Sequence, residues 1–129
     1  ILIDLVTCHI RACKQLLQEF PFLLSTSSLQ HLVCGAKDQL QDFYDTSCVI
    51  SQLDLVISVD TAVAHLAGAL DVPVWTMLQH NADFRWMRGR SDSPWYRSMT
   101  LLRQPKLGDW DGVLEQIHQH LTRLLGNAE

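Results

Sequence analysis

The sequence lacks the features that would place it in a membrane or on a nucleic acid. Its apolar runs are all shorter than the roughly 20 residues that a membrane-spanning helix needs. No basic start followed by an apolar core marks a signal peptide. The net charge of −4 argues against the strongly basic surface of general nucleic-acid-binding proteins. We therefore expect neither a membrane span nor a nucleic-acid partner.

Cysteine is present but lacks the spacing of a zinc site or a redox pair. The four residues, Cys8, Cys13, Cys34 and Cys48, form no CxxC pair and lie in apolar surroundings. Such residues are typical of free, buried thiols in a reducing cytosol, so we expect a cytoplasmic protein. The histidines show no metal-ligand pattern that would change this view.

Glycine is scarce, and its absence from one turn excludes two large classes of nucleotide site. The chain has six glycines, and none lies in the turn at Asp60-Thr61. A P-loop and a dinucleotide-binding fingerprint both need glycine at this place, so neither is present. No GxSxG motif occurs, and no cysteine lies in an activating motif, which argues against the common hydrolase arrangements.

The most informative stretch is Leu53–Met77, which reads LDLVISVDTAVAHLAGALDVPVWTM. Apolar residues dominate Leu53–Val59, as in a strand that is buried on both faces. After Asp60-Thr61 the apolar residues recur at helical spacing, and a second apolar run, Val72–Leu78, follows the turn at Asp71. Strand, helix and strand in this order form a βαβ unit, which implies a parallel sheet with helices packed on it. We therefore expect an α/β, Rossmann-like three-layer α/β/α fold.

The flanking segments predict further elements of one domain, which is what 129 residues allow. A short helix within Asp42–Gln52 would be capped by Asp45 or Thr46, and a final helix by Asp109 or Asp111. Two more elements are Ile1–Val6, a short strand or the tail of a linker helix, and Met99–Leu102, an edge or last strand.

The turn at Asp60-Thr61 is the first candidate binding site. In parallel sheets ligands lie beyond the carboxyl ends of the strands, and a helix that starts there offers free N–H groups to a phosphate. The Asp60 carboxylate and the Thr61 hydroxyl would meet the same ligand. The alternative is that Asp60 only caps the helix, which is worth about 1 kcal/mol. His65 would either donate to a phosphate or ribose hydroxyl, or be a hydrogen-bonded structural residue.

The loop Gln79–Ser98 is the second candidate, because loops of about twenty residues in compact domains are usually functional or disordered. Between Asp83 and Lys106 six basic residues face two acidic ones, so this segment carries about +4 and the remainder about −8. An anionic small ligand fits this distribution. The alternative is that the aromatics close the end of the sheet while the arginines are solvated. The residues that would stack on a base or sugar are Trp86, Trp95 and Tyr96, and those that would bind a diphosphate are Arg85, Arg88 and Arg90.

Several separated motifs, in the right order, resemble glycosyltransferase family nine. They are the run DFYDTSCVISQLDLVISVDTAVAHLAGALDVPVWTML, followed by DFRW, SPWY, RQ and GDW. The similarity covers Gln39 to about Leu125 and is strongest to bacterial, heptosyltransferase-like members that are often fused to tetratricopeptide repeats. It implies a GT-B architecture, in which two Rossmann-like domains face each other across a cleft. This chain would be the C-terminal half, which holds the nucleotide-sugar donor.

The resemblance also implies roles for individual residues. Asp60 would contact the donor sugar, Thr61 and Ala62 would offer backbone N–H groups to the diphosphate, and His65 would lie near the pocket. The cleft wall would be shaped by Arg85, Trp86, Trp95 and Tyr96. Members of the family work without a metal, so the nucleotide-sugar is a substrate and no cofactor is expected. The catalytic base that activates the acceptor would come from the N-terminal half.

Three hypotheses follow for the function of the chain. The first is the donor-binding half of an inverting, metal-independent glycosyltransferase, inactive when isolated. The second is a degenerate GT-B module with a structural or interaction role, and the third is an unrelated Rossmann-like sugar-phosphate sensor. The first expects Asp60, Thr61 and Arg85 to converge on an open pocket, whereas the second expects Trp86 or Trp95 to fill it.

The chain starts at Ile1 without Met, so we expect a piece of a longer protein. We divide it into a segment 1–38 packed on the domain and a nucleotide-sugar-binding core 39–129. Its partners would be the N-terminal GT-B domain or the tetratricopeptide-repeat region of the parent chain. An apolar face where that partner belongs would also allow a homodimer.

Overall fold

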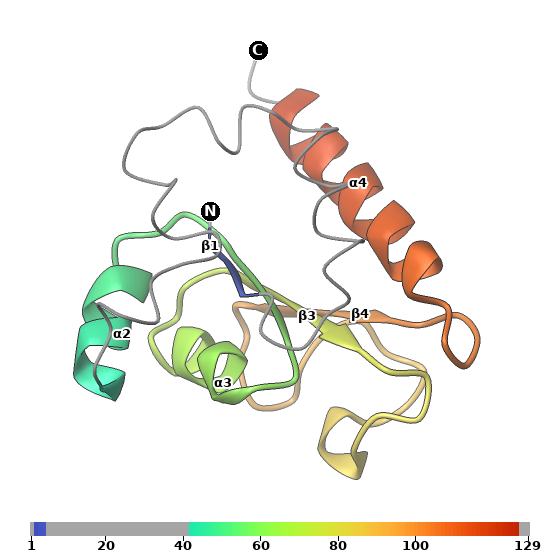
Figure 1. The fold of residues 1–129 in the computed structure, drawn as a ribbon, viewed down its shortest axis with the longest axis horizontal. Helices are drawn as coiled ribbons and strands as arrows, with labels where there is room; N and C mark the ends of the chain where they lie inside the picture. The colour runs from blue at the N-terminus through green and yellow to red at the C-terminus, as the bar shows by residue number, and fades with distance from the viewer. Residues whose placement is uncertain (1, 5–41, 127–129) are drawn as a thin grey trace.

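In the part of the chain that the structure describes, the fold is a parallel sheet of four strands whose order in the sheet is their order in the chain (Figure 1). The computed structural model describes residues 2–4 and 42–126. Within these residues the strands are β1 (Leu2–Asp4), β2 (Val56–Val59), β3 (Val74–Leu78) and β4 (Met99–Arg103). All neighbouring strands pair in parallel, with Val56 opposite Val74 and Val74 opposite Met99. The predicted α/β parallel sheet is therefore confirmed, as is the strand alternative for the start of the chain.

Helices cover both faces of this sheet, which gives three layers (Figure 1). Residues of β2 alternate, so Val56 packs toward α3 while Ile57 packs toward α4, and both are fully buried. The apolar stripe of α4 contributes Val113, Ile117 and Leu121 to its side. The helices are α2 (Phe43–Ile50), α3 (Ala62–Ala69), the short 3₁₀-helix η3 (Phe84–Trp86) and α4 (Trp110–Gly126).

Two helix starts show how the predicted caps compare with the structure. The cap of α2 is Asp42, whose carboxylate accepts the Asp45 N–H at 2.9 Å, so the prediction of Asp45 or Thr46 is wrong. An Asp at either position can cap a helix, and the earlier one allows three more residues to join it. For α4 the prediction of Asp109 is confirmed, because its carboxylate accepts the Gly112 N–H at 2.9 Å.

The strand before the candidate site is shorter than predicted. It begins at Val56, because the Leu53 N–H still bonds to Ile50 in the turn that follows α2. Its four residues are all buried, as the apolar run indicated. β4 is the last strand and forms one edge of the sheet, as expected.

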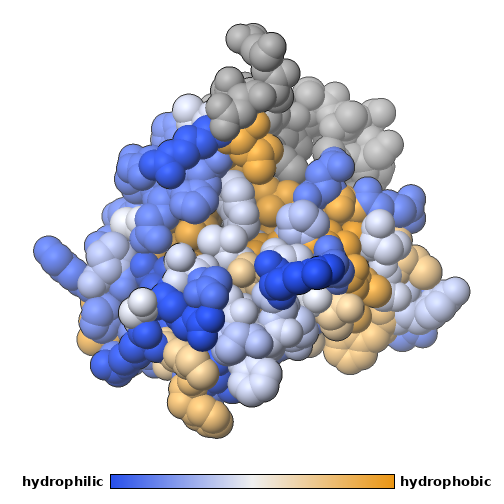
Figure 2. All heavy atoms as spheres, turned by 180° about the vertical axis from the view of Figure 1, so that it is seen from behind, coloured by the Kyte–Doolittle hydropathy of each residue, from blue (hydrophilic) through white to orange (hydrophobic). Residues whose placement is uncertain are grey.

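The surface carries charged and apolar areas side by side, and Figure 2 shows one such face. Three large exposed hydrophobic residues, Phe84, Met87 and Trp95, belong to the loop between β3 and β4. Cys48 is exposed on α2, so the expectation of a buried thiol is wrong there, while the other three cysteines lie outside the described residues. Of the helices in the described ranges, none is long and apolar enough to cross a membrane.

Candidate functional site

The centre of the site is the turn that joins β2 to α3 at the carboxyl edge of the sheet. Thr61 is the N-cap of α3, and its side chain makes no capping hydrogen bond to the helix. The reading in which Asp60 caps this helix is therefore wrong. The Thr61 N–H donates to the Val59 carbonyl at 2.7 Å, and its hydroxyl lies 3.2 Å from the Ser58 hydroxyl. Of the two N–H groups assigned to the diphosphate, that of Thr61 is thus already engaged.

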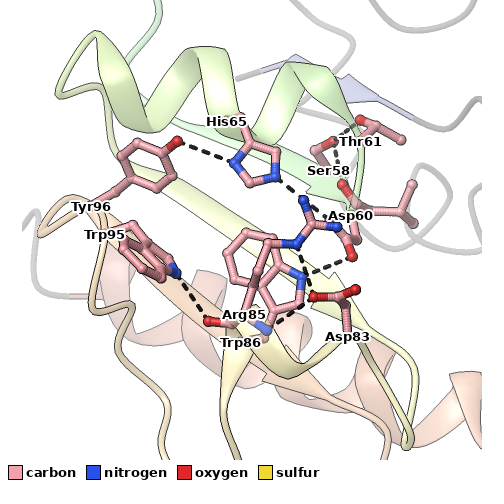
Figure 3. Close-up of polar contacts among 10 residues, drawn as sticks. Ser58, Asp60, Thr61, His65, Asp83, Arg85, Trp86, Trp95 and Tyr96 are labelled. Atoms are coloured by element: carbon pink, nitrogen blue, oxygen red, sulfur yellow. Dashed lines mark hydrogen bonds and ion pairs between the residues drawn. The ribbon is translucent and has the colours of Figure 1, made fainter.

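Asp60 is tied to a residue that is distant in the sequence. The indole N–H of Trp86 donates to Asp60 Oδ2 at 2.8 Å (Figure 3). The carboxylate is about one-third exposed, whereas Trp86 is fully buried. Trp86 is therefore part of the core on the α3 side, where it packs with Ala64 and Leu78. The DFRW segment and the β2–α3 turn, separated by 26 residues, meet at this hydrogen bond.

His65 lies between two aromatic side chains of the loop (Figure 3). Its ring stacks on Trp86 with centroids 5.1 Å apart and an interplanar angle of 26°. Nδ1 lies 3.1 Å from the Tyr96 hydroxyl, and Nε2 lies 3.9 Å from Asp60 Oδ1. Tyr96 reaches this position by packing closely over Gly68 of α3. His65 is therefore a hydrogen-bonded residue that joins both candidate segments.

Arg85 lies beside this group but is paired with Asp83. Its Nε donates to Asp83 Oδ1 at 2.9 Å, and its backbone N–H reaches the same oxygen at 3.0 Å. These bonds, first the backbone N–H and then the side chain, lower the pKa of the Asp83 carboxyl, and the Asp83 side chain raises the pKa of Arg85. The Arg85 carbonyl accepts the Trp95 indole N–H at 3.0 Å. The Arg85 side chain is half-exposed, so it is held by a surface ion pair.

Other arginines of the basic segment also have partners. Arg90 is paired with Asp92, and Arg97 with Asp71. Arg103 donates to the backbone carbonyls of the loop, and burial, followed by the charge of nearby Arg88, lowers its pKa. Asp83 and Asp92 are already counted in the local charge of about +4, so Asp71 is the partner from outside the segment that reduces this excess.

A pocket of about 350 Å³ opens beside Asp60. It lies beyond the carboxyl ends of β2 and β3, where ligands of parallel sheets bind. Of the predicted site residues, Asp60 lines it, whereas Thr61 and Arg85 are not part of its wall. The lining residues are Val59, Asp60, Met77, Gln79, Asn81, Ala82, Asp83 and Trp110.

Several of these residues were missed in the sequence, although a signal for them existed. Gln79 follows β3 as Asp60 follows β2, and parallel strands end at one edge of a sheet. Asp83 and Trp110 belong to the DFRW and GDW motifs that carried the family resemblance. Carboxylate and amide groups give this wall hydrogen-bonding capacity for hydroxyl groups. Among the described residues, no group of three or more His, Cys, Asp or Glu side chains could hold a metal ion.

Comparison with known families agrees with the family resemblance that the motifs indicated. The model of glycosyltransferase family 9 (heptosyltransferase) matches residues 28–108, which is more than half of the chain. No curated protein and no solved structure matches the chain. The parallel α/β sheet and the family match together show that this chain belongs to glycosyltransferase family 9.

Proposed function

We propose that this chain is the donor-binding half of an inverting, metal-independent glycosyltransferase of the GT-B type. The observation that carries the proposal is the position of Asp60. Its carboxylate lines the pocket at the carboxyl edge of the sheet, and the Trp86 indole holds it there at 2.8 Å. A partly exposed, fixed carboxylate can accept hydrogen bonds from sugar hydroxyls, which are donors of matching chemistry.

The two parts of a nucleotide-sugar would meet different surfaces of this site. The sugar would occupy the pocket, where Asp60, Gln79 and Asn81 offer oxygen and amide groups. The diphosphate would lie at the start of α3. There the Ala62 N–H would be the first backbone donor, because the Thr61 N–H already bonds to the Val59 carbonyl. As the bond to the sugar breaks, the backbone N–H groups at the start of α3 would stabilise the charge that develops on the leaving diphosphate.

Arg85 would approach the diphosphate by exchanging its partner. Its ion pair with Asp83 is exposed to solvent, and pairs of this kind contribute little to stability because water screens them. The free-energy cost of moving the guanidinium from the Asp83 carboxylate to a doubly charged diphosphate is therefore small. The acceptor hydroxyl would be activated by a base from the N-terminal half, so we expect the chain alone to bind donor without transferring sugar.

A second candidate function is a degenerate module with a structural or interaction role. The observation in its favour is the charge of the pocket, which has two carboxylates in its wall, Asp60 and Asp83. Arg85 and Arg90 are paired with carboxylates, and Arg103 is bonded to a backbone carbonyl. Trp86 also occupies the core behind Asp60. A site that no longer bound a diphosphate would tolerate all three features.

Calorimetric titration of the purified chain with UDP, GDP and ADP, with and without Mg²⁺, separates the two. Donor binding predicts that one nucleotide binds without Mg²⁺ and that Arg85→Ala weakens it severalfold. Arg97→Ala is the matched control, because it also breaks an exposed Arg–Asp pair, but its partner Asp71 precedes β3 and so lies at the opposite edge of the sheet from the site. Absence of binding to all three nucleotides would refute donor binding by this chain and favour the interaction module.

A further inference from the structure

Trp86 stands out because it is fully buried in a segment that is otherwise exposed. Its neighbours Phe84, Arg85 and Met87 are all exposed, and Trp86 has 0 % exposure. A buried tryptophan needs an acceptor for its N–H, and here that acceptor is a carboxylate that lines the pocket. The side chain therefore does more than fill space behind the site.

The hydrogen bond fixes one oxygen of Asp60 and leaves the other available. Oδ2 accepts the indole N–H, while Oδ1 faces His65 at 3.9 Å (Figure 3). Hydrogen bonds to an ionised acceptor are about twice as strong as neutral ones, and they are directional. The His65 ring stacks on the same indole, so the two rings that face the carboxylate lie against each other. Trp86 thus selects one orientation of the Asp60 side chain.

Trp86 is itself held in place from a third strand. Arg103, the last residue of β4, donates to the Met87 carbonyl at 2.6 Å and to the Trp86 carbonyl at 3.4 Å. Met87 adopts a left-handed conformation with φ of 50°, which a residue with a side chain rarely adopts unless its surroundings impose it. The Trp86 N–H also bonds to the Asp83 carbonyl at 3.1 Å. The end of β4 is thereby connected through the indole to the end of β2.

We propose that Trp86 is a positioning residue, which holds the Asp60 carboxylate in the orientation that receives the donor sugar, and that Arg103 anchors it. This inference rests on the proposed donor-binding function. Trp86 would act through its N–H group from behind the pocket. This differs from the role that the family resemblance implied, in which Trp86 contacts the donor from the cleft wall. Loss of the N–H should therefore weaken binding of the donor sugar and leave binding of the nucleotide largely unchanged.

Trp86→Phe tests this, because it keeps a buried aromatic ring and removes the N–H. The probes are UDP-glucose, GDP-mannose and ADP-glucose, each compared with its own nucleoside diphosphate by calorimetry. We expect Trp86→Phe to weaken the sugar-nucleotide that binds best at least tenfold, and its diphosphate less than twofold. A merely structural role would weaken both alike. Trp75→Phe, a buried change on the α4 side of the sheet, should leave both affinities unchanged.

The outcomes separate this inference from the function on which it rests. Wild-type binding that persists in Trp86→Phe with an unchanged preference for the sugar-nucleotide would overturn the positioning role and leave donor binding intact. Absence of wild-type binding would overturn both. If Trp86→Phe does not fold, Arg103→Lys replaces it, since lysine keeps the charge but offers a single donor nitrogen to the two carbonyls. A selective loss of sugar-nucleotide affinity in Arg103→Lys would support the role, and an equal loss of both ligands would overturn it.

Discussion

Replacing Gly68 with alanine should destabilise the protein, although alanine is the better helix former. Gly68 is a buried residue of α3, and a Cβ added there would lie 2.5 Å from Tyr96 Cγ and 2.8 Å from Cδ2. Such a contact requires the aromatic ring to move, and overpacking of this kind costs about 1–3 kcal/mol. The higher helix propensity of alanine stabilises the helix by about 1 kcal/mol. We therefore expect a net loss of about 1 kcal/mol in the free energy of unfolding.

The assay is urea unfolding of four proteins: wild type, Gly68→Ala, Tyr96→Ala and the double variant. With slopes of about 1–3 kcal/mol per M, a loss of about 1 kcal/mol lowers the midpoint by roughly 0.5 M. In the Tyr96→Ala background the ring is gone, so the same alanine should raise stability toward the propensity gain. The expected coupling between the two positions is thus about 2 kcal/mol. An equal effect of Gly68→Ala in both backgrounds would refute the packing argument.

Three further perturbations have outcomes that can be measured by the same unfolding assay. Asp71 has φ of 57°, so Asp71→Gly should relieve strain and stabilise by about 0.5–1 kcal/mol, although it also removes the exposed pair with Arg97; a lower midpoint would contradict this. Asp42→Ala removes the cap bond to Asp45 and should cost about 1 kcal/mol, with no change expected if the cap is replaced by water. The Arg85 backbone N–H, and then the Arg85 side chain, hold the folded-state pKa of Asp83 below its ordinary 3.8. Their stabilising effect is therefore present above pH 3.8 and is lost as the pH falls through that lowered pKa. The stability difference between wild type and Arg85→Ala should therefore shrink on acidification, and a constant difference would refute the pairing.

The fold could be predicted from the sequence because its signals are local. The change from a continuous apolar run to helical spacing at Asp60 marked the end of β2 and the start of α3. The exact starts of elements were less accessible, as at α2, where Asp42 and Asp45 are equally good caps by residue type. Which of the two caps the helix depends on how α2 and the turn before β2 pack on the sheet.

The candidate site could be predicted only in part because its main contact is not local. Trp86 lies among exposed residues without any period that would indicate burial. Its partner Asp60 lies 26 residues earlier, and no pattern in the loop indicates which aromatic residue points inward. The arginines posed the same problem, since the sequence shows their charge but not that Asp83 and Asp92 lie against them. The position of Asp60 beyond a strand end was the part that general topology could supply.

The loop between β3 and β4 also protects the sheet from other chains. After passing the site it returns along the free side of β4, where the Ser91 carbonyl accepts the Leu101 N–H at 2.7 Å and Asp92 forms an antiparallel bridge with Thr100. An edge strand with free backbone groups is a template for aggregation, and this segment covers it. The stretch of chain that contributes to the proposed binding site therefore also covers the edge of the sheet. A substitution that detaches the loop from β4 should therefore cause the protein to aggregate.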